Sequence, residues 1–163
     1  MAWSPSPQIR EKMNDIVAAY PDRKAACIPL LHAIQDEAGY VPENGVTWVA
    51  QELEMPKSQV EGVVTFYSMF SITPLGKYHL ELCTNVSCAL CGSESLLNEI
   101  EKELGIKAGE TTGDGLFTLS EVECLATCGM GPAMQVGDTI YEHLTPEKAR
   151  DIIYELKKGA VRK

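Results

Sequence analysis

Two stretches of the chain decide its fold: residues 78–91 read YHLELCTNVSCALC, and residues 116–128 read LFTLSEVECLATC. In each stretch apolar and polar residues alternate up to a cysteine, which is typical of a half-buried strand that ends in a loop. Between them, apolar residues recur at helical spacing from Leu96 to Leu104, and Gly105 follows as a left-handed helix end. The predicted order is therefore strand, cysteine loop, helix, strand, cysteine loop.

The end of the chain extends this pattern with a hairpin and a helix. Residues 133–141 form two short predicted strands around Gly137-Asp138, a dipeptide suited to a tight turn. Residues 145–147, Thr-Pro-Glu, supply a cap, a first-turn proline and a first-turn acid for the last helix. Strand, helix, strand, hairpin and helix in this order predict a thioredoxin-like sheet.

The residues before this sheet read as helical. Apolar residues at helical spacing predict amphipathic helices in residues 9–20, 23–38, 46–53 and 58–70. We expect Pro29 to bend the second helix, because it removes a backbone donor. We also expect Ser58 and Glu61 to form a capping box at the start of the fourth. The apolar stripe of the fourth helix continues to its end. We expect this stripe to be core rather than a partner surface; it includes Phe66, Tyr67, Met69 and Phe70.

The change from helical to alternating pattern at residues 73–76 predicts two domains. Residues 1–74 would form an N-terminal helical module, and residues 75–163 a thioredoxin-like α/β domain. The expected fold class of the whole chain is α+β.

Composition and charge exclude several functions. The 23 acidic residues outnumber the 14 basic ones and give a net charge of −9, which repels phosphate backbones, so we expect no nucleic-acid partner. The longest stretch without ionisable side chains, residues 62–76, is too polar for direct membrane insertion. Residues 1–12 lack the pattern of a secretion signal, so we expect a soluble, cytoplasmic protein. Six cysteines in a reducing compartment indicate metal ligands or redox groups rather than disulfides.

The cysteine spacing points to one metal centre. Cys83 and Cys88 follow the first predicted strand, and Cys124 and Cys128 follow the second. The carboxyl ends of neighbouring parallel strands meet at one edge of a sheet, which brings both loops together. Four thiolates are the usual ligands of a [2Fe-2S] cluster, one pair on each iron, so we expect an electron-transfer protein. Glycines beside the last ligand, at positions 129 and 131, would let backbone amides approach the sulfurs.

Other interpretations of the same cysteines stay open at this point. A structural zinc site also uses four cysteines, usually at shorter intervals, and Cys88 with Cys91 would form the C-x-x-C pair of a disulfide oxidoreductase. Within the iron-sulfur interpretation, Cys83, Cys88, Cys91 and Cys124 match the plant-type ferredoxin spacing. We prefer the two pairs, because Cys91 is expected at a helix start as a small, partly buried thiol.

The remaining candidates have structural interpretations. We expect Cys27 to be a small core residue. The three histidines, His32, His79 and His143, have no partner ligands at metal spacing and are expected to be structural or exposed.

At this point the sequence resembles the family of thioredoxin-like [2Fe-2S] ferredoxin subunits of respiratory NADH:quinone oxidoreductase, the E subunits of complex I. The resemblance covers residues 9–156, and its most specific parts are C-x4-C at 83–88 and C-x3-C at 124–128, with the following Gly-Pro-Ala-Met at 131–134. Two segments of the helical module, IPLLHAIQ at 28–35 and VEGVVTFY at 60–67, are also similar to that family. Ala126 stands where glycine is common in the family.

The resemblance implies a function within a larger complex. It implies one [2Fe-2S] cluster on this chain, no catalytic residues of its own, and FMN and NADH on a partner flavoprotein subunit, with which the cluster exchanges electrons. The chain would not oxidise NADH alone, and it would lie in the peripheral arm of a membrane-associated complex. The same module occurs in the diaphorase parts of NAD-linked hydrogenases and formate dehydrogenases, which is the alternative host. A zinc-stabilised interaction module is the non-redox alternative.

Overall fold

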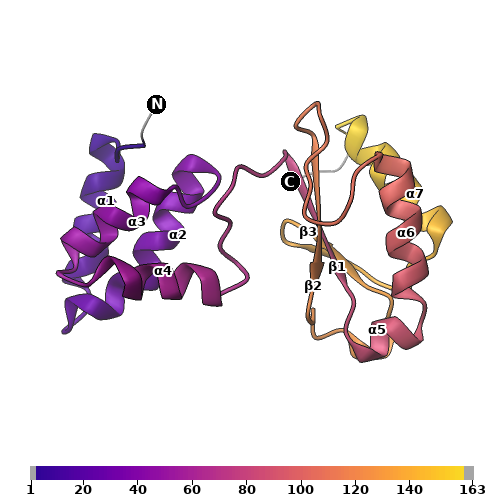
Figure 1. Cartoon of the computed structure of the whole chain (residues 1–163), viewed down its shortest axis with the longest axis horizontal. Coiled ribbons are helices and arrows are strands. Elements are labelled where there is room, and N and C mark those ends of the chain that lie inside the picture. Colours follow the sequence, from indigo (N-terminus) through magenta and orange to yellow (C-terminus); the bar gives the residue numbers. More distant parts are fainter. Residues whose placement is uncertain (1–2, 160–163) are drawn as a thin grey trace. The chain divides into compact units, whose positions relative to one another are not determined.

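The computed structural model describes residues 3–159, which form two compact units that divide between Pro74 and Leu75 (Figure 1). The first unit is helical, and the second combines a sheet with helices. Within residues 3–159, no helix has the length and the apolar character needed to cross a membrane.

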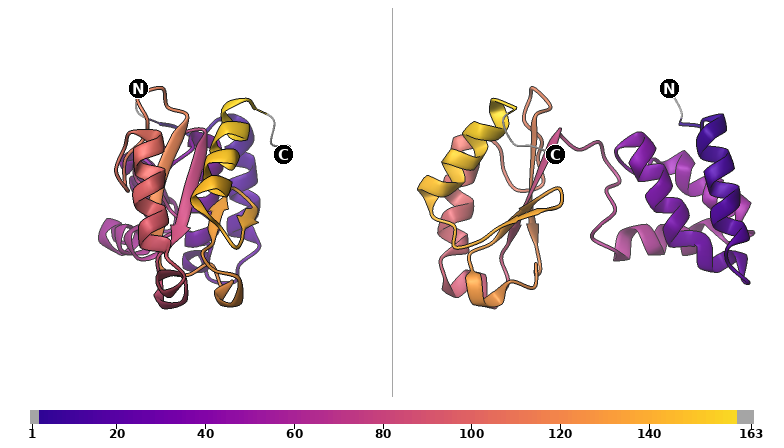
Figure 2. Two further views of the ribbon diagram at one scale, coloured as in Figure 1. Left: turned by 90° about the vertical axis from the view of Figure 1, so that its right-hand side faces the viewer. Right: turned by 180° about the vertical axis from the view of Figure 1, so that it is seen from behind.

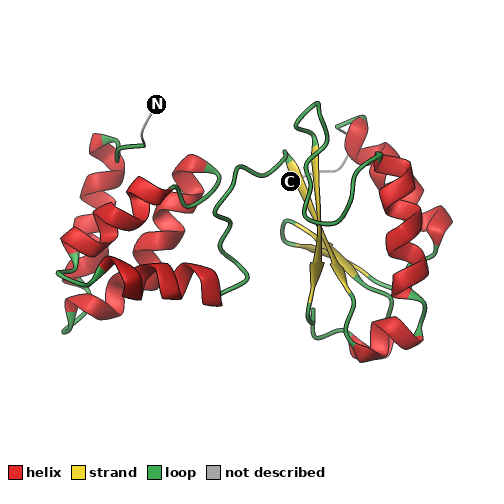
Figure 3. Cartoon of the chain, viewed as in Figure 1, coloured by secondary structure: helices red, strands yellow, loops and turns green. Residues whose placement is uncertain are grey.

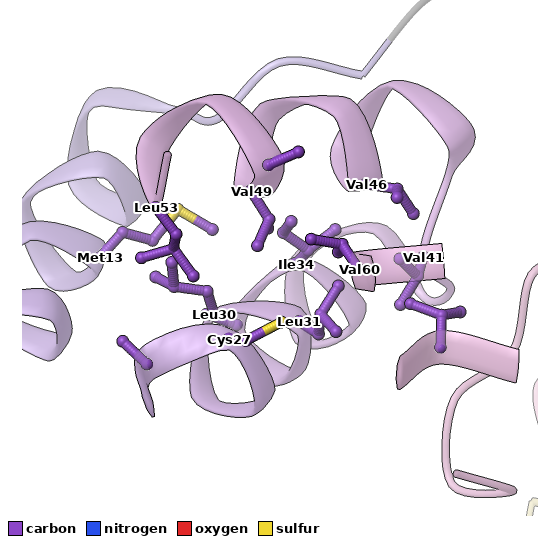
Figure 4. Close-up of a cluster of buried hydrophobic side chains, with 14 of the residues drawn as sticks. Met13, Cys27, Leu30, Leu31, Ile34, Val41, Val46, Val49, Leu53 and Val60 are labelled. Carbon is purple, nitrogen blue, oxygen red and sulfur yellow. The ribbon is translucent and has the colours of Figure 1, made fainter. Parts of the chain in front are cut away.

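The first unit consists of four α-helices and one 3-10 helix around an apolar core. In chain order they are α1 (Pro7–Ala18), η1 (Arg23–Ala26), α2 (Cys27–Ala38), α3 (Glu43–Glu52) and α4 (Lys57–Phe66). Each α-helix contributes buried side chains to one cluster, in which Met13, Leu30, Ile34, Val49 and Val60 have no exposed surface (Figure 4). Cys27 is 5% exposed and belongs to this cluster, which confirms its prediction as a core residue.

One local prediction for these helices loses its physical basis, and another is wrong. Pro29 lies in the first turn of α2, because residues 23–26 form the separate 3-10 helix. Amides of a first turn have no intrahelical acceptor, so the missing N–H gives no reason for a bend. At α4 the capping residue is Pro56 rather than Ser58, with no side-chain cap, and the carboxylate of Glu61 lies 3.3 Å from Lys57 Nζ instead.

The apolar stripe after α4 divides into a buried and an exposed part. Phe70 is 7% exposed and packs on the ring of His32, with ring centroids 4.9 Å apart, as expected of a core residue. Phe66 and Met69 are 79% and 49% exposed, so their prediction as core residues is wrong. The helix ends at Phe66, and Tyr67 has an extended backbone, so the helical spacing no longer applies beyond it.

The second unit is a four-stranded mixed sheet with helices packed against it (Figures 1 and 3). The strands are β1 (Tyr78–Cys83), β2 (Phe117–Val122), β3 (Met134–Val136) and β4 (Thr139–Tyr141), in the spatial order β2-β1-β3-β4. The pair β1–β2 is parallel, and the other two pairs are antiparallel. The connections contain α5 (Val86–Leu90), α6 (Ser93–Leu104) and η2 (Cys128–Met130), and α7 (Pro146–Lys157) follows β4.

The helices α6 and α7 lie on the same side of the sheet and enclose the core of this unit with it (Figure 1). Leu80, Leu119, Ile100 and Ile153 from β1, β2, α6 and α7 are at most 2% exposed. This arrangement confirms the α+β fold class and the thioredoxin-like sheet.

The predicted turn and capping residues of the second unit occur where expected. Gly105 ends α6 with φ of 69°, and Gly137 turns the β3–β4 hairpin with φ of 58°. The Thr145 side chain caps α7 by accepting a hydrogen bond of 3.3 Å from the Lys148 amide. The short helix α5 is a feature that the sequence pattern did not predict.

Candidate metal centre

The two cysteine loops leave the sheet at the same edge. Cys83 is the last residue of β1 and stands beside Val122, the last residue of β2, in the parallel register. Cys124 follows only two residues later. Since adjacent strands lie about 4.8 Å apart, the sheet itself sets the separation of the two loops.

Two of the four thiols are buried beneath this edge. Cys83 and Cys88 are each 3% exposed and pack around Ala133, which follows the second cysteine loop. The Cys83 amide donates to the Ala133 carbonyl at 3.0 Å. Asn85 caps α5 through a 2.8 Å bond from the Val86 amide, and this short helix carries Cys88 on its buried side.

The other two thiols are exposed. The Sγ atoms of Cys124 and Cys128 lie 3.9 Å apart. Ala126 between them has φ of 60°, in the left-handed region, and its amide donates to Cys124 Sγ at 3.3 Å. The Cys83 thiol reaches this second loop, where it donates to the carbonyl oxygen of Glu123 at 3.7 Å.

The thiols of the two loops are close enough to influence one another's ionisation. Burial disfavours the Cys83 thiolate, but the amides of Asn85 and Leu125 and the thiols of Cys88 and Cys124 donate to it and lower the pKa of Cys83 overall. Burial and the neighbouring Cys83 thiolate raise the pKa of Cys88. The Cys83 thiolate therefore opposes ionisation of the neighbouring Cys88 thiol.

Gly131 leaves room for the buried sulfur of Cys88. A Cβ atom placed on Gly131 would lie 3.2 Å from Cys88 Sγ and 3.4 Å from its Cα. The chain therefore passes close to the Cys88 sulfur at Gly131, as predicted, whereas a Cβ atom at Gly129 would meet nothing within 4 Å. Hydrogen bonds from the amides of these two glycines to the sulfurs stay a prediction.

Cys91 differs from its prediction. It follows α5 rather than starting a long helix, and it is exposed rather than partly buried.

The predictions for the histidines hold: His32 packs on an aromatic ring, His79 is hydrogen-bonded to Ser120 at 2.8 Å, and His143 is exposed. Among residues 3–159, no three His, Cys, Asp or Glu side chains are gathered as ligands around a single ion.

The fold and the thiols define a class: a thioredoxin-like protein whose two strand-end loops bring four cysteines to one sheet edge. The sequence model of the thioredoxin-like [2Fe-2S] ferredoxins matches residues 13–157. The chain belongs to this family. The resemblance found in the sequence is thereby confirmed, and the four thiols suit the iron-sulfur cluster that defines the family.

Relatives of this chain cover most of its length. It is 49% identical over 136 residues to the E subunit 2 of NADH-quinone oxidoreductase from Rhizobium meliloti, a match that covers 83% of this chain and 81% of the relative. It is 44% identical over 145 residues to the E subunit of NADH-quinone oxidoreductase from Rickettsia felis, with 87% of each chain covered.

A solved structure shares the fold. A chain of an NAD+-reducing [NiFe]-hydrogenase in the air-oxidised state aligns with a TM-score of 0.68 at 17% identity. The alignment covers 81% of the present chain and 23% of the hydrogenase chain. At this identity the likeness establishes the architecture alone.

Proposed function

We propose that this chain is an electron-transfer subunit of an NADH:quinone oxidoreductase of the complex I type. The observation that carries the proposal is the convergence of two cysteine loops at the end of the parallel strand pair β1–β2. The names of the relatives, which cover more than four-fifths of the chain, support the host complex.

We assign the cluster to Cys83, Cys88, Cys124 and Cys128, with the buried pair on one iron and the exposed pair on the other. The 3.9 Å separation of the Cys124 and Cys128 sulfurs supports the second pair. The plant-type alternative would replace Cys128 with the exposed Cys91. When bound, a [2Fe-2S] cluster accepts and releases one electron.

The backbone of the two loops stabilises the charge of the sulfurs. Amides of Asn85 and Leu125 donate to Cys83, and the Ala126 amide donates to Cys124. Hydrogen bonds to thiolates favour the more reduced state of such a centre, so these amides raise its reduction potential. The chain thus supplies ligands, burial and amide donors.

The proposal includes a partner. We place FMN and the NADH site on a neighbouring flavoprotein subunit, with which this chain exchanges electrons, and we place both in the peripheral arm of the complex. The sequence has no dinucleotide-binding fingerprint, which supports the expectation that the chain does not oxidise NADH alone. Residues 1–74 would act as a helical module and residues 75–163 as the ferredoxin domain.

A diaphorase subunit of an NAD-linked hydrogenase is the second candidate. The fold is compatible with this host, because a chain of an NAD+-reducing hydrogenase shares it. Purification of the tagged chain from its native organism decides between the two complexes, because either quinone-reductase subunits or hydrogenase subunits will co-purify with it.

Purification under anaerobic conditions tests the redox role itself. We expect a coloured protein with acid-labile sulfide, visible absorption that dithionite bleaches, and a paramagnetic signal on reduction. Colourless, sulfide-free protein despite adequate iron supply would exclude the redox role, and stoichiometric zinc in it would establish the interaction module. For the ligands, we expect Cys128→Ser to lose iron and Cys91→Ser to retain it; comparable loss in both would overturn the assignment.

A further inference from the structure

Cys124 and Cys128 form a pair of exposed thiols whose sulfur atoms lie 3.9 Å apart. Three residues separate them, and Ala126 in the middle has a left-handed backbone. Cys128 begins η2, which contacts α5 at the end of the second unit where both cysteine loops lie (Figure 2). Two accessible sulfurs at this separation are suited to thiol–disulfide chemistry, which is distinct from holding a cluster.

The segment between these two cysteines can bring their sulfurs together. A disulfide bond is about 2 Å long, so the sulfurs would have to approach by about 2 Å more. Within residues 3–159, the segment 123–126 takes part in no backbone–backbone hydrogen bond. Its backbone bonds to sulfur instead: the Glu123 carbonyl accepts from Cys83 at 3.7 Å, and the Ala126 amide donates to Cys124 at 3.3 Å. Sulfur is a weak hydrogen-bonding partner, so this movement has a small cost.

The other cysteines of the second unit are less suited to this chemistry. Cys83 and Cys88 are each 3% exposed, and thiol–disulfide exchange requires that the attacking sulfur reach its reagent. Cys91 is exposed, but Cys88, three residues away, is buried. Among the described cysteines, exposure and a short distance between sulfurs therefore coincide at Cys124 and Cys128.

We propose that, in the chain without a bound cluster, Cys124 and Cys128 are a modification site for small-molecule disulfides such as oxidised glutathione, which convert the pair into an intramolecular disulfide. One cysteine, as its thiolate, attacks a glutathione sulfur, and the S–S bond breaks. The glutathione that leaves takes up a proton. The second cysteine then attacks the protein sulfur of the mixed disulfide and releases the other glutathione. Two electrons pass from the protein to glutathione, which gains the two S–H bonds that the protein loses.

This disulfide and the cluster would compete for the same two sulfurs, a consequence that rests on the proposed function. Oxidation removes two of the four assigned ligands, while burial keeps Cys83 and Cys88 out of reach of the reagent. Exposed disulfides are the ones that thiols reduce most readily. The pair therefore gives the unloaded chain a reversible oxidised state, from which reduced glutathione restores the ligands.

The test treats the full chain, freed of metal by a chelator under reducing, anaerobic conditions, with oxidised glutathione after the reductant has been removed. Remaining thiols are alkylated in denaturant, and the masses of the tryptic peptides are measured. The chain has no lysine or arginine between residues 107 and 148, so Cys124 and Cys128 fall in one peptide, residues 108–148. The other three cysteines of the second unit fall in residues 78–102.

We expect the peptide 108–148 to lose two hydrogen atoms and to carry no alkyl group. This form should exceed the glutathione adduct of the same peptide at least about 10-fold, because a thiol held beside the mixed disulfide outcompetes free glutathione. Excess reduced glutathione should return the peptide to its reduced mass.

Two variants remove one partner of the pair. Cys128→Ser should leave glutathione on Cys124 as a lasting mixed disulfide, with complete loss of the internal disulfide. Cys124→Ser should do the same at Cys128, so either variant suffices if the other does not fold. The matched control is Cys91→Ser, which removes an exposed cysteine outside the pair. Its rate of internal disulfide formation should stay within about 2-fold of the unmodified chain, because surface substitutions have small effects.

The position of the disulfide decides the outcome. A bond that joins the peptides 78–102 and 108–148, or one within 78–102, in place of the Cys124–Cys128 bond would overturn the proposal. A glutathione adduct that persists on the unmodified chain as the main product would overturn it as well.

The cluster-loaded chain separates this inference from the proposed function. Its peptide 108–148 should stay reduced under the same treatment, because the cluster occupies both sulfurs. Oxidation of the loaded chain as fast as the metal-free chain would refute the competition between disulfide and cluster. If no cluster can be loaded at all, the proposed function fails, whereas the metal-free chain still decides whether Cys124 and Cys128 are a disulfide site.

Discussion

Replacing Ala126 with glycine should stabilise the second unit. Ala126 has φ of 60°, a conformation that costs an L-residue about 1–2 kcal/mol and costs glycine almost nothing. Glycine also loses more conformational entropy on folding than alanine does, which offsets about 0.5–1 kcal/mol of the stabilisation. The side chain is exposed, so no packing is lost. We therefore expect Ala126→Gly to raise the free energy of unfolding by about 0.5–1 kcal/mol.

The gain should appear without any change at the sulfur. The Ala126 amide that donates to Cys124 Sγ belongs to the backbone and remains in the glycine variant. Calorimetry of the whole chain under anaerobic conditions checks this, with loss of visible absorption marking the transition of the second unit. A gain of this size should raise that Tm by roughly 2–8 °C.

The control is Ala108→Gly, at a residue outside the left-handed region and half-buried. At this position glycine increases the conformational entropy of the unfolded chain. The free energy of unfolding should therefore fall by about 0.5–1 kcal/mol, and Tm by a few degrees. An Ala126→Gly variant whose transition is unchanged or lower would refute the reasoning, since it would mean that the left-handed backbone at this position stores no strain.

Three other perturbations have defined outcomes. Gly131→Ala should force the Cys88 sulfur aside and lower the free energy of unfolding by about 1–3 kcal/mol through overpacking. Its iron content should fall, whereas Gly129→Ala should retain iron. Equal iron in both variants would contradict the steric argument. Thr145→Ala should lower the free energy of unfolding by about 1 kcal/mol in denaturant titrations through loss of the α7 cap, and an unchanged midpoint would contradict it. Burial lowers the pKa of His79, so the fold holds this residue neutral; stability is therefore complete above the ordinary histidine pKa of about 6.5 and is lost as pH falls toward the lowered value. His79→Gln should show less of this decline, and an identical pH profile would exclude His79 as its source.

Features of the second unit that depend on short-range signals could be predicted from the sequence. Gly105 and Thr145 act on the ends of their own helices, and Gly137 acts on its own hairpin, so their neighbours in sequence suffice to recognise them. Alternation up to Cys83 predicted β1, because its two faces differ in burial. Because the cysteines follow the ends of two predicted parallel strands, the sequence also predicted where the two loops would converge.

The missed features depend on contacts that spacing does not encode. α5 is only five residues long, too short for an apolar period, yet it decides that Cys88 is buried while Cys91 is exposed. At α4, Ser58 had the pattern of a cap, but the helix begins one residue earlier at Lys57. The exposure of Phe66 follows from where α4 ends, which its own apolar character does not reveal.

The parallel pairing of β1 with β2 sets an order of events during biosynthesis. Cys83 and Cys88 are synthesised before the crossover through α6, and Cys124 and Cys128 only after it. Pairing of such distant segments is slow, so the apolar core between the sheet and its two helices must hold the newly made chain together first. For the proposed cluster, all four ligands therefore come together only once β1 and β2 have paired.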